Sequence, residues 1–213
     1  MKRILILAGI VLSALVLTAC AAIQDRVDAT AYERIHRTLV GMENFVAQAT
    51  VTFISNNNTH SYETLQHARS SGEYRIEVTA PANVAGNTTV FDGTTISQFN
   101  PRVSGRVSQT TMEAPERLEL LLTSFVRNFT DSPEVSISAA TINDAATTVL
   151  EAQVPGGHPY LATERLWVCN DTLLPKQMII YDANGVERVI VIFHSFEYNV
   201  NIDDNVFRVA ISD

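Results

Sequence analysis

Apolar and polar residues alternate along most of the chain after residue 45, which is the pattern of β-strands with one buried face. Between Phe45 and Phe53 every second residue is apolar. Strands are predicted at residues 45–53, 62–68, 74–79, 88–91, 95–99, 135–138, 147–154, 164–169, 176–181 and 186–196. Asp92-Gly93 favours a tight hairpin, because both residues accept the positive φ that this turn requires. Such strands predict an antiparallel sheet with one face open to water.

Two segments show the helical period instead. Ile35 and Leu39 recur at helical spacing within residues 29–41, and Gly41 is placed to end that helix. A second helix is predicted over residues 114–129, where Pro115 suits the first turn. Its apolar stripe, which either packs against the sheet or covers a ligand cavity, consists of Leu118, Leu121, Leu122, Phe125 and Phe129. Glu116, Glu119 and Asn128 are expected to face elsewhere.

The first twenty residues have the pattern of a bacterial lipoprotein signal. Lys2 and Arg3 precede a long apolar run, and Leu17-Thr18-Ala19-Cys20 has the form of a lipobox. The run is shorter than the roughly 20 apolar residues that a transmembrane helix needs. We therefore expect residues 1–19 to be removed and Cys20 to carry the lipid that holds the protein at the membrane. The alternatives are an uncleaved anchor and an ordinary signal peptide with a chance cysteine.

The remaining chain has no repeat, linker or compositional break. We expect residues 20–28 to be a lipidated tether and residues 29–213 to form a single α+β domain, with the helices on one face of the sheet. The formal net charge of −8, from 23 acidic and 15 basic residues, argues against nucleic acid as a partner. If Cys20 is acylated, Cys169 has no cysteine partner in its own chain. Its thiol is then either buried or part of an intermolecular disulfide.

The sequence holds no G-x-S-x-G, H-E-x-x-H or C-x-x-C motif and no glycine-rich phosphate loop. We therefore expect no enzyme activity, no catalytic residues and no cofactor. The nearest approach to a metal site is His60 with His67 across a hairpin, completed by Glu63 or Asp92. Solvated histidines on strands are the simpler interpretation, so no metal is expected.

Two turns and a tail in the C-terminal third carry more specific motifs. Thr172-Leu173-Leu174-Pro175 connects two predicted strands, Asp182-Ala183-Asn184-Gly185 connects the next pair, and Asp203-Asp204-Asn205-Val206-Phe207 closes the domain. Together with the first helix and the strand at residues 45–53, these motifs resemble the LolA/LolB-like lipoprotein-sorting superfamily. The resemblance covers nearly the whole mature chain.

This resemblance implies a half-barrel, a curved antiparallel sheet of about eleven strands covered by helices, with an apolar pocket inside. Members of the superfamily bind acyl chains of lipoproteins or other lipids in that pocket, without catalysis. The candidate pocket residues of this chain are Val51, Phe53, Phe91, Phe99, Leu118, Leu121, Leu122, Phe125 and Trp167.

Two functions are open at this point. The first is a membrane-anchored protein that binds lipid or lipoprotein acyl chains. The second follows from the lipid-anchored LolA-like proteins of Gram-positive spore formers, the branch of the GerS-type germination lipoproteins, in which the fold binds a cortex-modifying amidase. In both cases we expect the protein at the extracytoplasmic face of the cell membrane, or at the outer membrane in a Gram-negative host. In the second case an envelope protein is a further partner.

Overall fold

A computed structural model describes residues 28–103, 107–111 and 118–208 of the chain. Eleven strands, all paired with antiparallel neighbours, form one sheet. They are β1 (Asn44–Ile54), β2 (Thr59–Arg69), β3 (Tyr74–Ala80), β4 (Thr88–Phe91), β5 (Thr95–Phe99), β6 (Val107–Thr111), β7 (Ser136–Ile142), β8 (Ala145–Gln153), β9 (Thr163–Cys169), β10 (Pro175–Tyr181) and β11 (Glu187–Tyr198).

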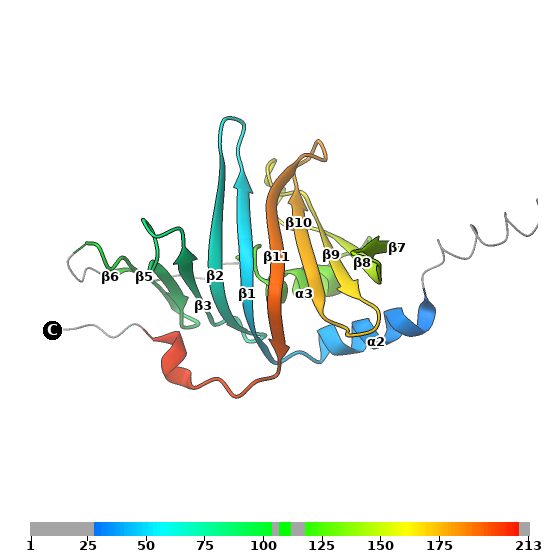
Figure 1. Ribbon diagram of the computed structural model, residues 1–213, viewed down its shortest axis with the longest axis horizontal. Coiled ribbons are helices and arrows are strands. Elements are labelled where there is room, and N and C mark those ends of the chain that lie inside the picture. The colour runs from blue at the N-terminus through cyan, green and yellow to red at the C-terminus, as the bar shows by residue number, and fades with distance from the viewer. Residues whose placement is uncertain (1–27, 104–106, 112–117, 209–213) are drawn as a thin grey trace, which may run out of the picture.

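The strand order in the sheet is β6-β5-β4-β3-β2-β1-β11-β10-β9-β8-β7, so the first and last strands meet at its centre. Among the described residues the sheet is accompanied by α2 (Ala29–Val40), α3 (Leu122–Asp131) and the short 3-10 helix η1 (Asp204–Phe207). Figure 1 shows α3 behind the sheet and α2 along its lower edge. The curved, helix-covered half-barrel expected from the sequence is confirmed.

The centre of the sheet shows why one face is buried. Strand β1 pairs with β2 on one side and with β11 on the other. Phe45, Ala47, Ala49 and Val51 are each at most 1% exposed and project from the same face of β1. They belong to one apolar cluster with residues of both α-helices. We call this the inner face of the sheet and the opposite one the outer face.

Helix α2 begins and packs as its sequence pattern predicts. The carboxylate Oδ1 of Asp28 accepts hydrogen bonds from the main-chain N–H groups of Thr30 and Ala31, at 3.0 and 3.2 Å, which caps the first turn. Ile35 and Leu39 lie one turn apart and are buried in the core. These core contacts hold the helix along the lower edge of the sheet (Figure 1).

Helix α3 starts later than predicted. It was expected from residue 114, but residues 112–117 lie outside the described part of the chain and the helix begins at Leu122. Leu121 has extended backbone angles, and its N–H donates to the carbonyl of Leu118 at 2.9 Å in a turn. Leu118 therefore lies outside the helical stripe that it was predicted to join. The prediction failed because a turn followed by a helix presents the same apolar spacing as one longer helix.

A polar contact in the interior joins α3 to the sheet. The Asn128 side-chain amide donates to Glu119 Oε2 at 2.9 Å and to Glu164 Oε1 at 2.8 Å. Asn128 is 2% exposed and Glu164, on β9, is fully buried. The expectation that Asn128 faces away from the core was wrong, because its amide donates to the buried carboxyl group of Glu164 and to the half-buried one of Glu119.

Three further features concern single elements. Strand β6 was not predicted, because its sequence Val-Ser-Gln-Thr-Thr contains one apolar residue and so shows no alternation. The thiol of Cys169 is buried and forms no disulfide within the described part of the chain, in agreement with the first of its two expected states. None of the helices in residues 28–208 that the structure describes has the length and apolar character needed to span a membrane.

Candidate functional site

A cavity of about 510 Å³ lies on the inner face of the sheet, between β1 and β5. Its apolar lining consists of Val51, Phe53, Ile76, Val78, Val84 and Ile96, and two tyrosines, Tyr62 and Tyr74, complete this part. Pockets that hold small apolar molecules in proteins have volumes of about 300–1,000 Å³ and a similar lining. The size and composition of the cavity therefore suit an apolar ligand.

One side of the cavity is polar and is formed by Asn87, Thr89 and Gln98, whereas a further polar residue, Thr64, lines the cavity from β2. In the sheet, Thr89 on β4 lies between Ile76 on β3 and Gln98 on β5. None of the described residues that line the cavity carries a formal charge at neutral pH. The cavity thus has apolar walls and one uncharged polar wall on the β4–β5 side.

The turn before α3 covers the cavity. Leu118 and Leu120 contribute to its lining, whereas Leu121 is 2% exposed and belongs to the core. Between them, Glu119 accepts the hydrogen bond from Asn128. The cover is therefore held from the core side by an apolar anchor and by a polar contact to α3.

The structure divides the nine candidate pocket residues into three groups. Three line the cavity: Val51, Phe53 and Leu118. Four belong to the apolar core cluster: Phe91, Leu121, Leu122 and Phe125. Phe91 packs beside the cavity, since its ring centroid is 5.6 Å from that of Tyr74.

The remaining two candidates, Phe99 and Trp167, lie on the outer face. Gln98 lines the cavity and Leu166 is fully buried in the core, so both point inward. Successive side chains of a strand point to opposite faces, which directs Phe99 and Trp167 outward. Alternation alone does not tell which face of a strand is inner, and this is why the two aromatic residues were grouped with the pocket.

Several lining residues were not among the sequence candidates, in particular Ile76 and Val78 on β3 and the polar residues Asn87 and Thr89. The alternation of Tyr74, Ile76 and Val78 was the available signal, since it places all three on one face of a predicted strand. The alternation itself does not tell whether space remains beneath that face, and the resemblance that implied a pocket did not place it under β3.

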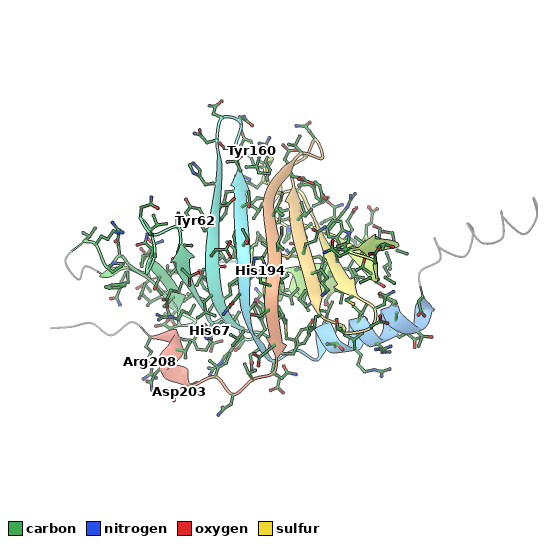
Figure 2. All side chains as sticks on the ribbon, viewed as in Figure 1. Tyr62, His67, Tyr160, His194, Asp203 and Arg208 are labelled. Carbon is green, nitrogen blue, oxygen red and sulfur yellow. The ribbon has the colours of Figure 1, made fainter. Side chains whose placement is uncertain are left out.

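A second polar cluster holds the turn between β10 and β11. Asp182 accepts N–H groups of Asn184 and Val186 at 2.8 and 3.0 Å, and Arg188 donates to it from Nε and Nη2 at 2.9 and 2.6 Å. The Val186 N–H, with further help from Arg188 and Asn184, holds the pKa of the Asp182 carboxyl below its usual range. The Arg188 guanidinium also lies over the ring of Tyr160, which Figure 2 labels near the top of the molecule. These groups satisfy one another, so the cluster stabilises the loops at this end.

The suggested histidine pair does not form. His60 and His67 lie on the same strand, β2, and their odd spacing of seven residues directs them to opposite faces. Burial and the charge of Arg75 lower the pKa of His67. His194 approaches Glu63 instead, with 3.5 Å between Nε2 and Oε2, and Figure 2 shows it away from His67. Within the described residues no three His, Cys, Asp or Glu side chains come together as a metal site.

The chain matches the model of one protein family over residues 1–207, and this family is described as "Sporulation protein YdcC-like". The match includes all strands of the sheet, both helices and η1. No sequence among the curated proteins matches the chain.

Chains of three solved structures are similar to this one. An uncharacterized conserved protein from Thermus thermophilus is 11% identical, with a TM-score of 0.53 over 85% of this chain and 93% of that one. A chain of the CwlD amidase–GerS lipoprotein complex from Clostridioides difficile is 25% identical, with a TM-score of 0.49 over 82% and 97%. A LolA superfamily protein from Nitrosomonas europaea is 14% identical, with a TM-score of 0.45 over 84% and 96%. Because the family model spans nearly its whole length, the chain belongs to the YdcC-like family of sporulation proteins.

Proposed function

We propose that this protein binds the acyl chain of a lipid or a lipoprotein in the cavity between β1 and β5 and performs no catalysis on it. The observation that supports this function is the cavity itself, with about 510 Å³ of space and a mainly apolar lining beneath Leu118 and Leu120. A packed protein interior has few voids larger than a water molecule, so space of this size on the inner face favours a ligand.

The free energy of binding requires a long acyl chain. Each CH₂ group removed from water contributes about 0.8 kcal/mol. About twelve such groups contribute about 10 kcal/mol, and association itself costs about 4–15 kcal/mol. Short acyl chains therefore bind weakly, and the ligands expected here are those with chains of the length found in membrane lipids.

The direct test is native mass spectrometry of the chain from Ala21 to Asp213, followed by solvent extraction of whatever copurifies. A bound fatty acid or other lipid near one per protein supports the proposal and identifies the ligand class. A protein that carries no lipid and takes up none when it is added contradicts it.

A substitution that fills the cavity gives a more specific test. Ile76→Trp places an indole ring in the space that the ligand needs, and we expect lipid uptake to fall by about tenfold or more, which is about 1.4 kcal/mol or more of binding free energy. The melting temperature should change little, because the larger side chain enters free space and does not compress the core.

The matched control is Thr79→Trp, which adds the same ring to the same strand at an exposed position that does not line the cavity. Equal lipid uptake by Ile76→Trp and Thr79→Trp would place the ligand elsewhere.

The N-terminal signal supports attachment at the extracytoplasmic face of the cell membrane through a lipidated Cys20. We expect Cys20→Ala to move the protein from the membrane fraction to the soluble fraction almost completely, since the lipid supplies the membrane affinity. Cell fractionation with an immunoblot measures this, and a melting curve equal to that of the unmodified domain controls for folding. A variant that still sediments with membranes would favour the uncleaved anchor.

A second function is supported by the family, whose members are described as sporulation proteins. In this alternative the anchored domain binds and regulates a cell-wall or spore-cortex amidase during germination, and the cavity has no ligand. Mass spectrometry that finds no lipid, together with a stable complex with such an amidase, would select it. A lipid-loaded protein without amidase binding would select the first function.

A further inference from the structure

The polar wall of the cavity consists of uncharged groups. Thr89 and Gln98 are opposite each other on β4 and β5, and Asn87 precedes β4 on the same side. No lysine, arginine or histidine is among the described residues that line the cavity. A carboxylate or phosphate brought to this wall would find no cation, and an ionised group that leaves water unpaired is costly. The formal net charge of −8 adds to that cost.

Two hydrogen-bond acceptors without partners among the described residues lie on the inner face of this part of the sheet. Gln66 on β2 is fully buried and is paired with Ile76 on β3. Its side-chain Oε1 has no hydrogen-bond partner within the described residues. The carbonyl oxygen of the Asn87 side chain is likewise buried without a partner there. Buried polar atoms in proteins normally have partners, so each of these oxygens requires a donor.

The donors of Gln66 and Thr64 are used within the protein. Gln66 Nε2 donates to Thr64 Oγ1 at 3.2 Å, and that hydroxyl in turn donates to the carbonyl of Ala49 at 3.0 Å. The hydroxyl proton of Thr64 is thus already used in a hydrogen bond within the protein. The unpartnered acceptor that lines the cavity is thus the Asn87 side-chain carbonyl, and a hydroxyl group of a bound molecule can donate to it.

We propose that the cavity selects an uncharged single-chain lipid with a hydroxyl-bearing head group, of the monoacylglycerol type, over a fatty acid of the same chain. The acyl chain of this lipid lies against the apolar wall of Val51 and Ile76, beneath Leu118. The hydroxyl groups of the head donate to the polar wall, at Asn87, Thr89 and Gln98. This selectivity rests on the proposed function, since it defines which lipid the same cavity takes.

Photo-crosslinking of the full-length chain in its own membranes tests the selectivity. Two probes are compared at equal, non-saturating concentration: palmitate with a diazirine in its chain, and the monoglycerol ester of that same acid. We expect the ester to label peptides from β3 to β5 about tenfold more strongly than the acid does, because an unpaired charge and unmet acceptors both disfavour the acid.

Gln98→Lys supplies the missing cation and should raise labelling by the acid until the preference is lost or reversed. Gln48→Lys makes the same change on β1 at an exposed position that does not line the cavity, and should leave the preference unaltered.

Equal labelling of the wild-type cavity by both probes overturns the selectivity and leaves acyl-chain binding standing. Labelling of the cavity by neither probe overturns both. A preference for the ester that Gln98→Lys does not change overturns the placement of the head group at this wall.

Discussion

Phe45→Ala is expected to lower the free energy of unfolding by about 3–5 kcal/mol, the range for removing a buried aromatic ring. Phe45 is fully buried on β1, and its ring stacks on that of Phe196 with 4.9 Å between centroids. The cavity left behind would lie where β1 meets β11, at the centre of the sheet, where little can collapse into it. Urea denaturation followed by circular dichroism measures the change.

The matched control is Phe53→Ala on the same strand. Phe53 is 39% exposed, so the same chemical change should cost about 1 kcal/mol or less. Similar losses of unfolding free energy for the two variants would show that the paired strands β1 and β11 do not form the centre of the core.

Asn128→Asp is expected to destabilise the protein by about 3–5 kcal/mol at neutral pH, as the insertion of an unpaired buried charge does. It replaces an amide that donates to Glu119 and Glu164 by a third carboxyl group of the same size. Ionised carboxylates accept hydrogen bonds and cannot donate them, so both contacts become repulsive.

The pH dependence follows from the sign of that repulsion. Nearby negative charges raise the pKa of a carboxyl in the folded state above its unfolded value. The folded variant then binds more protons than the unfolded chain. Its loss of unfolding free energy relative to wild type should therefore become smaller as the pH is lowered. Urea midpoints measured from neutral to mildly acidic pH test this. Asn57→Asp, at an exposed turn, should show neither the loss nor this trend.

Most strands could be predicted because their signal is local. Alternation between Phe45 and Val51 appears directly as buried and less buried positions on β1. The hairpin between β4 and β5 has the predicted bounds, but its central residues are Gly93 and Thr94, since the Asp92 N–H donates to the carbonyl of Thr95 and only Gly93 has a positive φ. Asp92 instead accepts the N–H groups of Thr94 and Thr95 with its carboxylate. Strand β6 lacked any such signal, since its pairing with β5 depends on the neighbouring strand and not on its own pattern.

The elements predicted incorrectly depend on contacts between distant segments. The start of α3 is set by the turn that places Glu119 beside Asn128, and Asn128 is buried because Glu164 on β9 receives its other hydrogen bond. The sequence places Asn128 and Glu164 36 residues apart, and no periodicity connects them. Tertiary contacts of this kind override a local helical pattern.

The cavity could be predicted only in part for a related reason. Val51, Phe53 and Leu118 were identified as pocket candidates and do line the cavity. A residue that lines an empty space and one that fills the core show the same alternation, so Ile76 and Phe91 cannot be distinguished before the sheet is folded. The resemblance to a known superfamily supplied the expectation of a pocket, and the structure supplies its position.

The pairing of β1 with β11 has a consequence for folding during synthesis. The side chain of Asn199, just after β11, accepts a hydrogen bond from the main-chain N–H of Asn44, 155 residues earlier. Contacts of such long sequence separation form late and slowly in folding. The central seam cannot close until the last strand has left the ribosome, so the chain stays free of its final fold during synthesis.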